Sequence, residues 1–171
     1  MEQDQTPPGR ALALRPVVVA WLLAVGVDLL LNAGLFAGLF DREPGLLADE
    51  VLFRRIPVAY LGLATGVVGL AWLIDRADQR GALAGARMSA LAGVVVASMG
   101  VVSLWSAIDM TGLFVAAGAL VQVVELTAAG AVLGAFRVGG DRRRLTRRVL
   151  LLALSLAVLG IVAQNILNGN G

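Results

Sequence analysis

The chain has 171 residues, of which 58% are hydrophobic and only 15% are charged, and its net charge is +2. Soluble domains typically carry about 25% charged residues, so this composition excludes a water-soluble enzyme fold, a disordered chain and a fibrous repeat. The absence of cysteine and histidine excludes disulfides, thiolate chemistry and histidine-based metal or haem ligation within the chain. We therefore expect an integral membrane protein without cofactor or metal.

Five apolar runs are long enough to cross a hydrocarbon core, which takes about 17–25 helical residues. They comprise residues 17–40, 57–74, 88–108, 112–136 and 149–167. The sequence thus predicts an all-α, polytopic transmembrane bundle with one domain over 17–167. A cytoplasmic tail at 1–16 precedes this domain, and a short exterior tail at 168–171 follows it.

Residues that favour helix ends lie beside these runs. Pro16 and Pro57 are expected at the first position of the first and second helices. Thr111 and Thr146 are expected to cap the fourth and fifth. Each Trp and Tyr of the chain lies near a predicted helix end, as in the aromatic belts at lipid headgroups: Trp21, Tyr60, Trp72 and Trp105.

The connection at residues 41–56 is the longest predicted exterior segment. It combines apolar side chains such as Leu46 and Leu47 with charged ones such as Asp49 and Arg54. This mixture fits a short helix lying on the membrane surface, and it equally fits a solvated connector. Both interpretations stay open at this point.

Arginines supply all fourteen basic residues, and they sort by side of the predicted membrane. Eleven fall in the N-terminal tail, the second loop and the fourth loop, and three fall in the first loop. Because short arginine-rich loops stay in the cytoplasm, we expect the N-terminus inside and the C-terminus outside. The small net charge, spread over short loops, argues against a nucleic-acid partner.

Glycines spaced four apart indicate where helices touch. The pairs are Gly34 and Gly38, Gly62 and Gly66, and Gly130 and Gly134. Such small residues let two helix backbones approach closely in a membrane. We expect these pairs to form contacts inside the bundle in preference to a dimer interface.

Two acidic residues lie in the middle of predicted spans, namely Asp28 in the first and Glu125 in the fourth. Asn32 and Gln122 lie four and three residues from them, so each acid shares a helix face with an amide. Because the two helices run in opposite directions, the acids fall in one layer and the amides in the next layer outward. These four residues form the candidate binding cluster.

The third predicted helix adds polar residues in its outer half. Ser103 and Ser106 share a face, and Asp109 ends the helix at the outer surface. If these faces converge with the candidate cluster, a polar path leads from outside to the membrane middle and stops there.

The two acids allow two interpretations. They can share a proton, or hold a cation or small polar ligand, as adjacent carboxyl groups do when they cannot both ionise. Alternatively each is neutral and hydrogen-bonded to Asn32, Gln122 or a backbone carbonyl, so that it only joins helices.

No catalytic motif occurs in the sequence, so we expect a protein without enzymatic activity. A small transporter or channel component would use the two acids directly. The alternative is a non-catalytic partner that assembles with or regulates another membrane protein, with the acids in a structural role. Besides the bilayer, expected partners are therefore another membrane protein or further copies of the chain.

A weak family resemblance covers about residues 17–138. It comprises Val27-Asp28 followed by Asn32-Ala33-Gly34-Leu35-Phe36, and later Gln122-Val-Val-Glu125 leading to Gly130 and Gly134. This arrangement resembles small uncharacterised multi-pass bacterial membrane proteins that are grouped as a domain of unknown function. The resemblance implies a helical bundle in the bacterial cytoplasmic membrane, implies no activity, and leaves the fifth helix as an addition.

Overall fold

The structure is a computed structural model and describes residues 13–40, 49–107 and 110–168. In these ranges the regular structure is helical throughout, with no strand. Its elements are α1 (Leu14–Asp28), the π-helix η1 (Leu29–Leu35), α2 (Ala37–Phe40), α3 (Asp49–Arg76), α4 (Ala82–Ala107), α5 (Gly112–Ala135) and α6 (Arg142–Asn168).

Five helical segments are long and apolar enough to cross a membrane, which confirms the predicted number of spans and the all-α class. They are Leu14–Leu35, Arg54–Arg76, Ala82–Ser106, Gly112–Ala135 and Arg142–Leu167. The fourth agrees with its prediction to within one residue, whereas the other four begin earlier than predicted.

The first span is not the uninterrupted α-helix over 17–40 that its hydropathy predicts. It is α-helical to Asp28 and then forms a π-helix of seven residues from Leu29 to Leu35. At Phe36 the backbone leaves the helix, with φ −105° and ψ 5°. The Phe36 amide donates to the Leu31 carbonyl, a π-type bond five residues back, at 2.8 Å. Hydrophobic periodicity alone does not detect this change, because the apolar run continues through the segment to Phe40.

The second span begins before Pro57, which was expected at its first position. Helix α3 starts at Asp49 and includes Pro57 within it. Part of the first loop is therefore the first two turns of a spanning helix, and a separate surface helix over these residues is wrong. Residues 41–48 lie outside the described part of the chain.

Capping side chains mark where α5 and α6 begin. Thr111 caps α5 as predicted, because its side chain accepts a hydrogen bond from the Phe114 amide. Thr146 does not cap α6, which already begins at Arg142. Asp141 takes that role, since its Oδ1 accepts hydrogen bonds from the amides of Arg143 and Arg144 at 2.9 and 3.0 Å.

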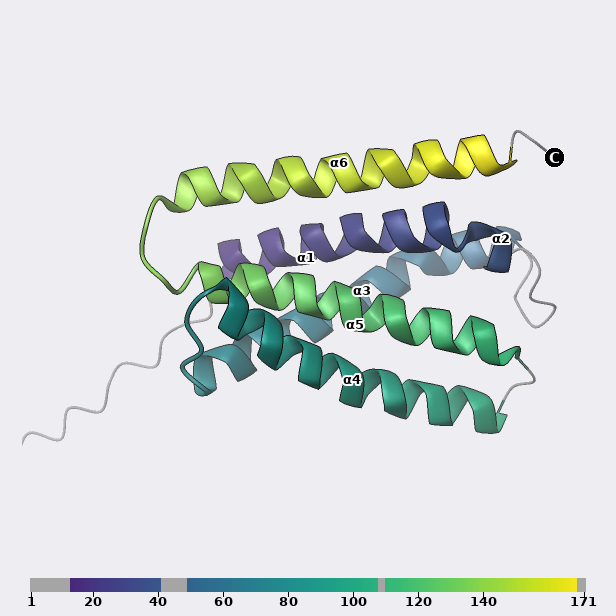
Figure 1. The fold of residues 1–171 in the computed structure, drawn as a ribbon, viewed down its shortest axis with the longest axis horizontal. Helices are drawn as coiled ribbons and strands as arrows, with labels where there is room; N and C mark the ends of the chain where they lie inside the picture. Colours follow the sequence, from purple (N-terminus) through teal and green to yellow (C-terminus); the bar gives the residue numbers. More distant parts are fainter. Residues whose placement is uncertain (1–12, 41–48, 108–109, 169–171) are drawn as a thin grey trace, which may run out of the picture.

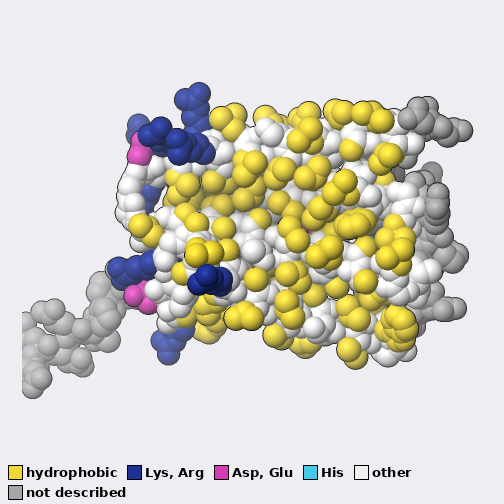
Figure 2. Space-filling view, viewed as in Figure 1, with side chains coloured by type: hydrophobic (Ala, Val, Ile, Leu, Met, Phe, Trp, Pro, Cys, Tyr) yellow, Lys and Arg dark blue, Asp and Glu magenta, His cyan; other side chains and the backbone are white. Residues whose placement is uncertain are grey.

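Figure 1 shows how the helices are arranged: α6, α1, α5 and α4 lie side by side, and α3 crosses behind α1 and α5. The start of α1, the α3–α4 turn and the α5–α6 connection meet at one end of the bundle. The space-filling view in Figure 2 shows the arginines gathered at this end. We call it the arginine end, and the opposite one the far end.

Two helix pairs approach closely through glycine. A side chain added at Gly130 or Gly134 of α5 would overlap α4 at Ser89 or at the backbone near Gly85, which confirms this predicted pair as a contact face. Gly34 of η1 contacts Gly160 of α6. The other predicted positions differ: among the described residues, a Cβ at Gly38 or Gly62 would have no neighbour within 4 Å, and one at Gly66 would meet a Leu126 methyl group.

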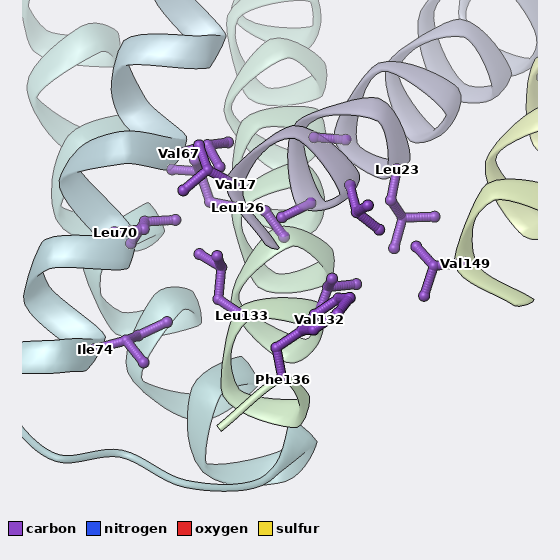
Figure 3. Close-up of a cluster of buried hydrophobic side chains, with 14 of the residues drawn as sticks. Val17, Leu23, Val67, Leu70, Ile74, Leu126, Val132, Leu133, Phe136 and Val149 are labelled. Carbon is purple, nitrogen blue, oxygen red and sulfur yellow. The ribbon is translucent and has the colours of Figure 1, made fainter. Parts of the chain in front are cut away.

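The hydrophobic core lies in the half of the bundle nearer the arginine end (Figure 3). It combines the first half of α1, the second halves of α3 and α5, and the first half of α6. Its larger members include Leu23, Ile74, Leu126, Leu133 and Phe136. This placement leaves the two midspan acids at the border of the densely packed region.

Candidate functional site

Asp28 is the last residue of α1 before the π-helix begins. Its two carboxylate oxygens accept one hydrogen bond each: Asn32 Nδ2 donates to Oδ1 at 2.6 Å, and the Tyr60 hydroxyl donates to Oδ2 at 2.9 Å. Asn32 belongs to η1 and Tyr60 to α3, so the carboxylate joins two separate parts of the bundle. The predicted pairing of Asp28 with Asn32 is present in this geometry.

Glu125 lies on the face of α5 that packs against α1, and its side chain is only 7% exposed. Its carboxyl group lies close enough to that of Asp28 for the two to interact electrostatically. Helices one and four of the predicted set therefore face each other at their acids. We call Asp28, Glu125, Asn32 and Tyr60 the midspan cluster.

No arginine compensates the midspan acids among the described residues. The ion pairs found there all involve Asp75 or Asp78, at the arginine end. Asp28 accepts hydrogen bonds only from the uncharged Asn32 and Tyr60, and the described residues give the Glu125 side chain no hydrogen bond. Two neighbouring carboxyl groups without a counter-charge cannot both ionise at moderate cost, so this arrangement favours a bound proton or cation.

Asn32 contributes a second unusual feature. Its Oδ1 atom is buried and accepts no hydrogen bond, while its Nδ2 atom donates to Asp28. Buried polar atoms without a partner are uncommon in folded proteins. The midspan cluster therefore offers three acceptor-bearing side chains, from Asp28, Glu125 and Asn32, to a ligand that donates hydrogen bonds or carries positive charge.

The remaining predicted site residues are not drawn into this cluster. Gln122 is half-buried on α5, and the described part of the chain gives its side chain no hydrogen bond. Ser103 and Ser106 are exposed on α4, which packs mainly on α5, and the Ser106 hydroxyl donates to the Ser103 carbonyl at 3.0 Å. Asp109 lies outside the described residues. Within those residues, the serines of α4 do not join the midspan cluster in a polar path.

Tyr60 is the site residue that sequence reasoning missed. Its position near a predicted helix end favoured a role in the aromatic belt, but its hydroxyl reaches Asp28. Trp21 also makes a contact inside the bundle, because its Nε1 donates to the Tyr60 carbonyl at 3.1 Å. Trp72 and Trp105 remain exposed, at 60% and 64%. A helix start placed at Asp49 would have put Tyr60 three turns inside α3 and suggested an inward role.

A dry layer separates the midspan cluster from the arginine end. Residues that precede Asp28 in α1 and follow Glu125 in α5 supply much of the buried core, among them Ala20, Leu23, Leu126 and Ala129. Toward the far end, Val115, Ala117 and Val121 of α5 are buried as well. The acids are therefore enclosed by buried residues in both directions along α5.

A second group of charged residues lies at the arginine end. Arg137 donates through one terminal nitrogen to Asp75 and through the other to Asp78 at 2.8 Å, and Arg80 Nε donates to Asp78 at 3.2 Å. The hydrogen bonds from Arg80 and Arg137 lower the pKa of Asp78 below its usual value. The hydrogen bond to Asp75 is the main cause that raises the pKa of Arg137. We call these four residues the arginine-end network.

No protein-family description, curated protein or solved structure matches this chain. The resemblance to small multi-pass bacterial membrane proteins stays a prediction.

Proposed function

We propose that the protein is a small transporter or channel component of the bacterial cytoplasmic membrane. In this proposal the Asp28–Glu125 pair binds a proton, a cation or a small polar ligand in the middle of the bilayer. The observation that carries it is the proximity of two carboxyl groups on the packed helices α1 and α5, with no arginine beside them among the described residues.

The energetics of the bilayer support a functional role for this pair. An ionised carboxylate at the membrane centre costs about 2.5–3.5 kcal/mol on insertion scales, so acids there are rare and mark proton or ion pathways. Tyr60 and Asn32 reduce that cost at Asp28 by donating hydrogen bonds. Glu125 has only 7% of its surface exposed, so a proton or cation between the two acids offsets a charge that solvent does not.

The π-helix next to Asp28 also supports the proposal. Such segments are rare and occur frequently at functional sites. Asn32, which donates to Asp28, lies within this π-helix, so the segment and the proposed site are directly joined.

The distribution of arginines gives the proposed orientation. Short arginine-rich loops remain in the cytoplasm, so the arginine end faces inwards and the far end outwards. The buried core then lies between the midspan cluster and the cytoplasmic side.

Ion flux into liposomes tests the proposal. Purified protein is reconstituted, and dissipation of imposed proton and sodium gradients is followed with entrapped pH- and sodium-sensitive dyes. We expect flux of one of these ions above that of empty liposomes, with loss to background in Asp28→Asn and Glu125→Gln. Asp78→Asn is the matched control, because it makes the same chemical change outside the cluster, and it should keep the wild-type flux.

Two outcomes would contradict a role of the pair in proton or sodium transport. One is wild-type protein that is folded and reconstituted but carries neither ion. The other is an unchanged flux in folded Asp28→Asn and Glu125→Gln variants, which would assign the acids a structural role and favour a non-catalytic partner or regulatory subunit.

A further inference from the structure

The arginine end contains a cavity of about 350 Å³ that the midspan proposal does not use. It lies between the start of α1, the ends of α3 and α5, and the start of α6. This volume is at the lower end of the about 300–1,000 Å³ typical of small-molecule sites. The cavity therefore has room for a small ligand or a lipid headgroup.

Its charged lining is mostly basic. Arg80, Arg137 and Arg142 line it together with one acid, Asp75. Asp75 is already bonded to Arg137, and Asp78 outside the lining is bonded to Arg80 and Arg137. Even with both acids counted, three arginines against two acids leave one positive charge uncompensated. The cavity thus favours an anion.

Two of these arginines retain donors without an acceptor in the described part of the chain. The Nε atom of Arg137 is buried and unpartnered, although both terminal nitrogens are engaged. Arg142 forms no ion pair there, and only its backbone carbonyl is used, by Arg15 and Thr146. Oxygen atoms of a bound anion would satisfy such donors.

The rest of the lining is apolar. Ile74, Leu133 and Phe136 form one wall, and Val17 and Ala71 lie beside them. A cavity that combines arginines with aliphatic and aromatic side chains matches an amphiphile better than a free inorganic ion. Its position at the ends of the spans, where the arginines gather, corresponds to the depth of lipid headgroups (Figure 2).

We propose that this cavity is a binding site for an anionic phospholipid, with the phosphodiester held by Arg142, Arg80 and Arg137 and the glycerol and upper acyl chain against Ile74, Leu133 and Phe136. Basic pockets between transmembrane helices on the cytoplasmic side recognise such headgroups. The ligand would also join α6 to α3 and α5 at this end. The inference does not depend on transport by the midspan cluster.

Native mass spectrometry of the full chain in a neutral detergent tests the inference. Dioctanoyl phosphatidylglycerol and dioctanoyl phosphatidylcholine are titrated separately, and inorganic phosphate is added as a competitor. We expect one tightly bound phosphatidylglycerol per chain, weaker binding of phosphatidylcholine, and little competition by phosphate at the lipid's concentration. An Arg80→Gln/Arg142→Gln variant should bind phosphatidylglycerol about 25-fold more weakly, at a factor of about five for each arginine.

The matched control is Arg143→Gln/Arg147→Gln, which removes the same charge from exposed positions of α6 outside the cavity. It should keep wild-type affinity, and circular dichroism should show both double variants folded. Equal loss in the two double variants would overturn the site in favour of general charge attraction. Equal affinity for the two lipids would overturn recognition of an anion, and displacement by equimolar phosphate would overturn the assignment to lipid.

Discussion

At the arginine end Asp75 and Asp78 are held by guanidinium groups. In the midspan cluster, the described residues give Asp28 only the uncharged donors Asn32 and Tyr60, and they place Glu125 near it without an arginine. An arginine costs little desolvation free energy where its side chain stays exposed. Arg80 and its partner Asp78 are both exposed. At the bilayer centre an arginine–carboxylate pair costs more desolvation free energy. A proton or a small cation can neutralise a carboxylate there instead. Acids at one depth are thus neutralised by fixed arginines, whereas at the other depth they are left to a proton or cation under the proposed function.

The largest expected effect comes from giving the midspan cluster its own fixed cation. In Glu125→Lys the new ammonium lies beside Asp28, so we expect folded protein to accumulate near the wild-type level. The matched variant Val124→Lys places the same charge one position away, on an exposed side of α5. It should lose accumulation steeply, because a lysine at the membrane centre costs about 2.5–3.5 kcal/mol.

Membrane-fraction yield and gel-filtration profiles of the two variants measure this difference. Equal accumulation of Glu125→Lys and Val124→Lys would contradict the geometry, since it would mean that position 125 has no acid partner. A folded Glu125→Lys variant should also carry no ion flux, because its ammonium permanently occupies the place of the exchangeable cation.

The next effect concerns the arginine-end network. Arg137→Gln removes the hydrogen bonds to Asp75 and Asp78 that join α5 to the end of α3. Hydrogen bonds to charged groups contribute about 1.5–3 kcal/mol, so we expect the free energy of unfolding to fall by about 1.5–3 kcal/mol. Denaturant titration in mixed micelles, read by circular dichroism, measures it.

Arg143→Gln serves as the control for that loss. Its side chain is exposed and makes no ion pair in the described residues, so its unfolding free energy should stay within about 0.5 kcal/mol of wild type. If Arg137→Gln were equally silent, the network would be a surface feature without a role in holding α3 to α5.

A smaller effect is expected from Tyr60→Phe, which removes one donor from the midspan cluster without changing the ring. Because Tyr60 bonds Asp28 at 2.9 Å, the loss should be about 0.5–1.5 kcal/mol in unfolding free energy. Thr65→Val on the same helix is the control, since the Thr65 hydroxyl bonds only the Leu61 carbonyl within α3. Similar values for both variants would show that the Tyr60 hydroxyl adds nothing between helices.

These two regions also differ in how far sequence could predict them. Hydropathy gave the five spans because burial in lipid demands long apolar helices, and the antiparallel order of helices one and four put Asp28 and Glu125 at one depth. The role of Tyr60 depended on where α3 begins. Loop composition misplaces that start, because the residues from Asp49 onwards continue the helix beyond the apolar run.

Other features arise only from packing between distant segments. The π-helix at Leu29 lies where η1 and Gly160 of α6 approach closely, and no local pattern in the sequence encodes it. Arg137 bonds two acids that lie about sixty residues earlier in the chain. The serines of α4 fall on one helix face as predicted, but periodicity does not tell whether that face meets the bundle or the lipid.

The smallest expected effect concerns the pKa of Asp78, an exposed acid of the arginine-end network. Hydrogen bonds from Arg80 first, and from Arg137 second, hold its pKa below the model-compound value of 3.8. An acid with a lowered pKa in the folded state stabilises the fold above its unfolded pKa, and this contribution is lost as pH falls through the folded pKa. The network should therefore be intact at neutral pH and weaken only below about pH 4. Carbon-13 NMR of the Asp78 carboxyl group in micelles should show the titration midpoint rising toward 3.8 in Arg80→Gln.

The control is Arg76→Gln, which removes a nearby arginine that forms no ion pair among the described residues. It should shift the Asp78 midpoint less than Arg80→Gln does. Equal shifts would mean that general charge near the turn, and not the Arg80 hydrogen bond, holds Asp78 ionised.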